Sequence, residues 1–204
     1  MIDVNEHDLF LLRQRWAPVI NRYEFTLPAA NGDPGEPVCF VEQARFKFKE
    51  DIRFFADDSK QVEVMRLKAR QRFDPAARYD ITDANGVKIG ELQKVFGASL
   101  LRSTYRLYDA SGNETAKATE RSLVVALFRR LVGFVPYVGG YADWLPIPYH
   151  FEFKRGEQVL ASNTRRAWKI SDTYRIDLSG DPERTLDRRL VLATAVGMDA
   201  LQAR

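Results

Sequence analysis

The stretch LVLATAVGM, residues 190–198, decides the fold of this chain. It follows a charged segment in which Asp181-Pro182 is expected to open a helix, and Arg188 and Arg189 directly precede it. Its residues are apolar or nearly so on every side, and a helix that is hydrophobic all round must be buried all round. It is also too short to span a bilayer, which takes about 20 residues. Because the preceding residues read largely as β-hairpins, we expect strands wrapped around a C-terminal core helix.

The composition is typical of one β-rich globular domain. The 204 residues are 45% hydrophobic and 12% aromatic, and the thirteen Phe and eight Tyr favour strands. Chains of this length often form a single β-sandwich or barrel, so we predict one domain over residues 1–204. The net charge is only +3, so the placement of the charges matters more than their sum. The single Cys39 rules out an internal disulfide and fits a reducing compartment, which favours a cytoplasmic location.

A repeated pattern predicts a meander of hairpins. Residues 79–86 and 105–112 share the pattern Y-x-[IL]-x-D-A-x-G, and residues 149–156 form a looser copy. Each copy leads alternating apolar residues into a turn, and Asn-Gly and Ser-Gly are hairpin signals. If Gly86 or Gly112 took the sixth place of a helix–loop–helix calcium loop, the first and twelfth places would hold apolar residues instead of carboxylates. We therefore interpret both as turns.

The sequence offers little for catalysis. Its two histidines, His7 and His150, do not show a metal-ligand spacing, and no nucleophile-elbow, Walker or dinucleotide-binding motif occurs. Cys39 lies in the apolar run VCFV with no basic neighbour to activate it, so a structural thiol is favoured over a nucleophile. We predict a non-enzymatic protein with no catalytic residue, no metal and no cofactor.

Cations alternate with apolar residues along the predicted strand from Val62 to Phe73. Met65, Leu67, Ala69 and Phe73 fall on one face, and Arg66, Lys68, Arg70 and Arg72 fall on the other. The same arrangement recurs at Arg45, Lys47 and Lys49. If the two strands are adjacent, these seven residues form a cationic patch suited to phosphates of lipid headgroups or nucleic acid. The alternative is the ordinary charged outside of a sheet. Nucleic acid is not favoured, because no recognition-helix, zinc-finger or RNP-type motif is present.

A second candidate lies within a predicted helix-plus-loop insertion at residues 120–148. Its helix is basic and amphipathic, and the loop that follows is rich in Gly, Pro and aromatic residues. We predict that Leu127, Phe128, Tyr137 and Trp144 enter a membrane interface. The alternatives are a helix that caps the end of the barrel and a protein-docking surface at residues 134–148.

The order of these segments resembles the tubby-like superfamily, specifically its phospholipid-scramblase and LURP-one-related branch. The resemblance covers roughly residues 38–203 and rests on an ordered series: F-x-F-K-E-D-I-R-F-F (46–55), the two Tyr-containing repeats, D-x-Y-R-I-D-L (172–178) and L-V-L-A-T-A-V-G-M-D (190–199). It implies a closed twelve-stranded antiparallel barrel with the C-terminal helix through its centre. Tubby proteins bind phosphoinositides through basic surface residues, whereas the Cys-rich palmitoylation segment of scramblases is missing here, so lipid flipping is not carried over.

These observations predict a cytoplasmic, non-enzymatic module that associates peripherally with membranes through anionic phospholipid or phosphoinositide headgroups. Two other functions stay open. The protein could be an interaction scaffold that docks a partner through residues 134–148. It could also carry a small apolar ligand if the C-terminal helix lies outside the barrel and leaves a pocket inside it.

Overall fold

A computed structural model describes residues 2–15, 20–44, 51–70, 78–95, 104–121, 150–166 and 173–202. The described strands are β1 (Leu9–Arg15), β2 (Ile20–Pro28), β3 (Pro34–Ala44), β4 (Asp51–Phe55), β5 (Glu63–Ala69), β6 (Arg78–Asp83), β7 (Lys88–Val95), β8 (Thr104–Asp109), β9 (Glu114–Glu120), β10 (His150–Arg155), β11 (Gln158–Arg166) and β12 (Thr173–Asp177). A short 3-10 helix, η1 (Val4–Glu6), precedes them, and the helix α2 (Arg188–Gln202) follows them.

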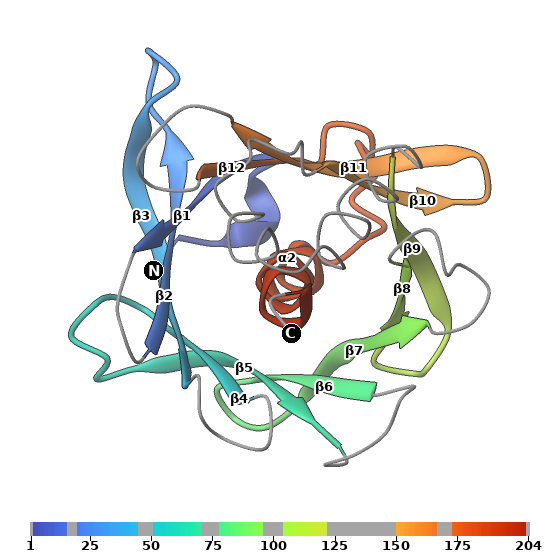
Figure 1. Ribbon diagram of the computed structural model, residues 1–204, viewed down its shortest axis with the longest axis horizontal. Helices are drawn as coiled ribbons and strands as arrows, with labels where there is room; N and C mark the ends of the chain where they lie inside the picture. Colours follow the sequence, from blue (N-terminus) through green and yellow to red (C-terminus); the bar gives the residue numbers. More distant parts are fainter. Residues whose placement is uncertain are drawn as a thin grey trace, which may run out of the picture.

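These strands form a closed antiparallel barrel (Figure 1). Each strand pairs with its neighbours in the sequence, and β1 pairs with β12 from Leu9↔Asp177 to Arg13↔Thr173 to close the ring. Closure leaves no edge strand in the sheet. The predicted barrel of twelve antiparallel strands with a C-terminal helix is confirmed.

Apolar and polar side chains alternate along the strands, so that one set fills the barrel and the other faces outward. In β5, Met65, Leu67 and Ala69 are buried, while Arg66 is half-buried and Lys68 is exposed. The predicted division of this strand into an apolar and a cationic face is therefore confirmed over β5. Arg72 and Phe73, at the end of the predicted strand, lie outside the described residues.

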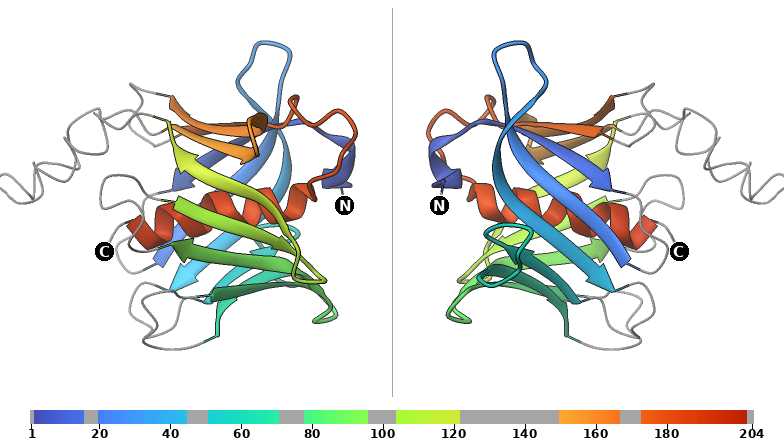
Figure 2. Two further views of the ribbon diagram at one scale, coloured as in Figure 1. Left: turned by 90° about the vertical axis from the view of Figure 1, so that its right-hand side faces the viewer. Right: turned by 90° about the vertical axis from the view of Figure 1, so that its left-hand side faces the viewer.

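The helix α2 runs lengthwise through the barrel (Figures 1 and 2). The side chains of residues 190–196 and of Met198 are each at most 1% exposed, as the all-round apolar sequence requires. Two glycines let the helix and the wall approach each other closely. A Cβ on Gly197 would stand 3.0 Å from Cδ2 of Leu92, and one on Gly90 would stand 3.2 Å from Cδ1 of Leu190.

The helix begins at Arg188 and not at Asp181-Pro182, so the predicted start was wrong. The Asp181 carboxylate accepts hydrogen bonds from the backbone N–H groups of Thr185 (3.1 Å) and Leu186 (2.9 Å). Arg184 takes a left-handed conformation with φ 54°, which no helix residue adopts. An Asp-Pro pair resembles a helix N-cap in sequence, but here the carboxylate closes a separate turn before the helix.

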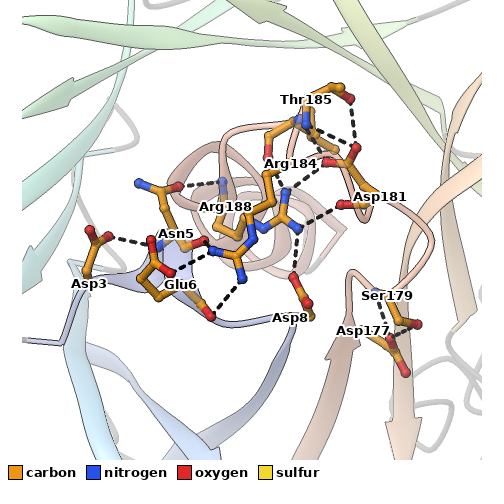
Figure 3. A network of polar contacts seen from close by, with 11 residues as sticks. Asp3, Asn5, Glu6, Asp8, Asp177, Ser179, Asp181, Arg184, Thr185 and Arg188 are labelled. Atoms are coloured by element: carbon orange, nitrogen blue, oxygen red, sulfur yellow. Dashed lines mark hydrogen bonds and ion pairs between the residues drawn. The ribbon is translucent and has the colours of Figure 1, made fainter.

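A buried network of ion pairs fixes the start of α2 to the N-terminal segment (Figure 3). Arg188 is 0% exposed, and its Nη1 donates to Oδ2 of Asp181 (2.8 Å) while its Nη2 donates to Oδ1 of Asp8 (2.7 Å). Burial would raise the pKa of Asp181, but hydrogen bonds from Leu186, Thr185 and Arg188 outweigh burial and lower it. Although the buried Nε of Arg188 has no hydrogen-bond partner among the described residues, the two carboxylates tie the start of α2 to Asp181 and to Asp8 of the N-terminal segment.

The predicted repeats are confirmed as hairpin turns. Oδ1 of Asp83 accepts hydrogen bonds from the backbone of Asn85 (2.9 Å) and Val87 (2.8 Å), and Oδ1 of Asp109 accepts one from Asn113 (2.8 Å). Gly86 and Gly112 supply the positive φ values that these turns need, 79° and 88°. The repeated Asp therefore holds the backbone of each turn.

Candidate anion-binding surface

The structure describes three of the seven predicted anion-binding residues: Arg66, Lys68 and Arg70. Arg45, Lys47, Lys49 and Arg72 lie outside the described residues, and so do Leu127, Phe128, Tyr137 and Trp144. The same holds for residues 122–148 of the predicted insertion and for the predicted docking surface at residues 134–148.

Carboxylates on neighbouring strands neutralise two of the three described cations. Arg66 makes a bidentate pair with Asp51 of β4, at 2.7 Å from Nε and 2.6 Å from Nη2. Arg70 makes a similar pair with Asp80 of β6, at 2.8 and 2.6 Å, and its Nη2 also lies 2.6 Å from Oε1 of Glu91. The hydrogen bonds from Arg66 lower the pKa of Asp51, so this carboxylate stays ionised at neutral pH. The guanidinium groups of Arg66 and Arg70 are thus engaged in ion pairs within the sheet. Of the three described cations, Lys68 alone forms no ion pair with a described residue.

Four other cations and one glutamine lie directly opposite one another in a row across five strands. Cross-strand register pairs Arg78 of β6 with Gln93 of β7, Gln93 with Arg106 of β8, Arg106 with Lys117 of β9, and Lys117 with Lys154 of β10. We call these five residues the basic row. Neighbouring strands are about 4.8 Å apart, so the row extends over about 19 Å of the barrel wall. Its four cationic side chains are between 37% and 50% exposed.

Tyr108 of β8 supports the beginning of the basic row. The guanidinium carbon of Arg78 lies 5.3 Å from the centre of the Tyr108 ring, which is within the range of a cation–π contact. The Tyr108 hydroxyl donates a hydrogen bond to Oε1 of Gln93 at 2.8 Å. The aromatic ring therefore holds two members of the row against the sheet.

Carboxylates are scarce at the other end of the basic row. Arg106 and Lys117 share Glu114, at 3.7 and 3.4 Å, and Lys154 and Arg121 share Glu152, at 2.8 and 3.5 Å. The Lys154 ammonium lowers the pKa of Glu152 through a hydrogen bond and keeps it charged.

Register also places like charges directly opposite each other. Arg106 faces Lys117, and Lys117 faces Lys154. Such pairs destabilise a sheet, and an external anion would relieve the repulsion. The end of the row on β8–β10 is therefore an electropositive surface built on rigid strands.

A model of one protein family matches most of the chain. This model, described as LURP-one-related, matches residues 38–199. The chain belongs to the LURP-one-related family. No curated protein and no solved structure matches it. Membership favours a lipid-related or ligand-binding barrel, while the wider resemblance to tubby-like proteins and scramblases stays a prediction.

The matched range begins inside β3, so β1 and β2 precede it. Both strands are nevertheless part of the LURP-one-related barrel, because β1 pairs with β12 and with β2 to close the ring.

The interior of this LURP-one-related barrel is occupied by its own helix (Figure 1). The ligand-carrier hypothesis required α2 to lie outside the barrel, and that condition is not met.

Cys39 of β3 is buried, and burial raises the pKa of its thiol to about 12, so it stays protonated and unreactive at neutral pH.

Neither a cluster of metal ligands nor a membrane-spanning helix is found in the described parts of this LURP-one-related chain. Those parts hold no group of three or more His, Cys, Asp or Glu side chains placed to bind a metal ion. No helix among the described residues is both long and apolar enough to cross a bilayer.

Proposed function

We propose that this LURP-one-related protein is a non-enzymatic module that binds anionic phospholipid membranes reversibly through its basic row. The observation that carries this proposal is the register of Arg78, Arg106, Lys117 and Lys154. The row follows the curved wall of the barrel from β6 to β10, so its end on β8–β10, with Arg106, Lys117 and Lys154, is the part that can meet a plane of phosphates. Each basic residue near an anionic surface contributes about 1 kcal/mol, so three of them support a weak and reversible association.

The predicted β5 residues have a supporting part in this proposal. Lys68 is exposed, and register places it between Asp51 and Asp80, so these carboxylates offset part of its charge. Arg66 forms an ion pair with Asp51, and Arg70 forms ion pairs with Asp80 and Glu91. Replacing either arginine by glutamate would therefore place two negative charges next to each other in a buried or half-buried position. Such variants would confound loss of binding with loss of stability. Lys117 and Lys154 are better positions for testing the proposal.

A further part of the proposal is contact with the membrane interface through Leu127, Phe128, Tyr137 and Trp144.

Co-sedimentation of the protein with liposomes tests the proposal. We expect the protein to pellet with liposomes that contain phosphatidylserine and to stay in solution with pure phosphatidylcholine. Pelleting should fade as salt is raised from about 0.05 to 0.5 M, because ions screen exposed charges at shorter distances as their concentration increases. Equal pelleting with both liposomes, or none with either at low salt, would overturn the proposal.

A further inference from the structure

A hollow lies on the outer wall of the barrel where the basic row ends. Its volume is about 250 Å³, and it opens to solvent between β9 and the end of β10. The polar side chains that line it belong to Glu114, Thr115, Lys117, Thr119, Lys154 and Arg155. Three of these are cations and one is a carboxylate, so an anion is the favoured occupant.

Arg155 is held in this hollow by neutral groups. Its Nε donates a hydrogen bond to the backbone oxygen of Thr115 at 2.9 Å, and its Nη1 donates to the hydroxyl of Thr185 at 3.0 Å. No ion pair joins it to a carboxylate of the described residues, and its Nη2 donates to none of them. The guanidinium is therefore oriented in advance and forms no ion pair within the described residues. Its Nη2, which has no partner among them, can donate to phosphate oxygens.

Lys117 and Lys154 add two mobile point charges beside this fixed group. They lie directly opposite each other on β9 and β10, and each has one carboxylate partner: Glu114, on the wall of the hollow, for Lys117 and Glu152, which does not line it, for Lys154. One guanidinium and two ammonium groups around a small hollow match a compact dianion better than a single negative charge. A phosphate monoester carries about −1.5 to −2 charges at pH 7 and three acceptor oxygens.

We propose that this hollow is a binding site for a phosphate monoester, with Arg155 as the orienting group and Lys117 and Lys154 as the neutralising ones. The site rests on the proposed function to the extent that the basic row supplies both lysines. Arg155 lies outside the row, so the two proposals can be separated. The monoester could belong to a lipid headgroup or to a soluble molecule. Glu114, on the wall of the hollow, opposes binding.

Titration with inorganic phosphate at constant ionic strength and pH 7.5 tests the site. The variant Arg155→Gln should bind phosphate about tenfold more weakly, because it loses a charged hydrogen bond. The variant Glu114→Gln should bind severalfold more tightly, because it removes the carboxylate from the wall. Arg175→Gln, which removes a cation paired with Asp177 on β12, is the matched control and should not change the affinity.

Tighter binding by Glu114→Gln is informative even if Arg155→Gln is less stable, because misfolding cannot raise an affinity. Wild-type protein that binds no phosphate, or a Glu114→Gln variant that binds no more tightly than wild type, would refute the site.

Vesicles of equal surface charge distinguish the sources of the phosphate. Phosphatidic acid carries a monoester and phosphatidylserine does not. Preference for phosphatidic acid that Arg155→Gln abolishes, with binding to phosphatidylserine retained, would place the monoester on a lipid. Phosphate binding in solution with no vesicle binding would support the site with a soluble ligand and overturn the membrane proposal. Equal binding to both vesicles with no phosphate binding would leave the membrane proposal standing and refute the site.

Discussion

The variant Asp181→Ala should lose about 3–5 kcal/mol of unfolding free energy, because it leaves the buried Arg188 without its main carboxylate. Domains of this kind have only about 5–15 kcal/mol in total, so the variant should be close to unfolding at room temperature. Urea unfolding followed by circular dichroism measures the difference. The loss should be large because Arg188 is 0% exposed, so water cannot replace the carboxylate.

The matched control is Asp187→Ala in the same segment. Asp187 pairs with Arg189 at 2.7 Å and caps α2, since its Oδ1 accepts the backbone N–H of Arg189 at 2.9 Å. Both side chains are partly exposed, so its loss should cost about 0.5–2 kcal/mol, clearly less than the loss at Asp181. The double variant Asp181→Ala/Arg188→Met should recover part of the loss, because it also removes the buried guanidinium that has lost one of its two carboxylate partners. Equal destabilisation by Asp181→Ala and Asp187→Ala would show that the buried ion pair between Arg188 and Asp181 does not contribute the large stabilisation proposed for it.

The variant Gly197→Leu should lose about 1–3 kcal/mol of unfolding free energy, because the added side chain has no room between α2 and the barrel wall. A Cβ at this position already stands 3.0 Å from Leu92 and 3.2 Å from Leu67, and a leucine adds three more carbons beyond it. Thermal unfolding of the wild type and of Gly197→Leu measures the difference in stability.

Gly197→Ala is the graded control for this substitution. Alanine favours a helix over glycine by about 1 kcal/mol, which offsets the tight contact of a single methyl group. We therefore expect little net change for alanine and a clear loss for leucine. If leucine were as stable as the wild type, α2 would not be packed inside the barrel as described.

The sequence predicted the buried helix because burial on all sides is a property of one continuous segment. Residues 190–198 have no polar face, so no position on the surface could suit them. The start of the helix could not be placed in the same way. Whether Asp181 caps a helix or closes a turn depends on Arg188 and on Asp8, which is distant in sequence.

The site was harder to predict, because its charges are arranged across strands. The alternation in β5 is visible along one strand, but the partners of Arg66 and Arg70 lie on β4, β6 and β7. The basic row takes one residue from each strand, so it appears only when the register is known. One signal was present in the repeat: Arg106 follows its Tyr where Asp80 follows Tyr79, which replaces an acid by a base at the same place.

Co-sedimentation of charge-neutralised variants with phosphatidylserine liposomes tests most directly whether the basic row carries membrane binding. Lys117→Gln/Lys154→Gln removes the two lysines from the electropositive end of the row, and Arg53→Gln/Arg175→Gln is the matched control on strands outside the row. In both pairs each cation has a carboxylate partner, Glu114 and Glu152 in the row and Asp51 and Asp177 in the control. We predict that the row variant binds at least about tenfold more weakly while the control binds like the wild type. Equal binding by the two variants would contradict the assignment of membrane binding to the basic row.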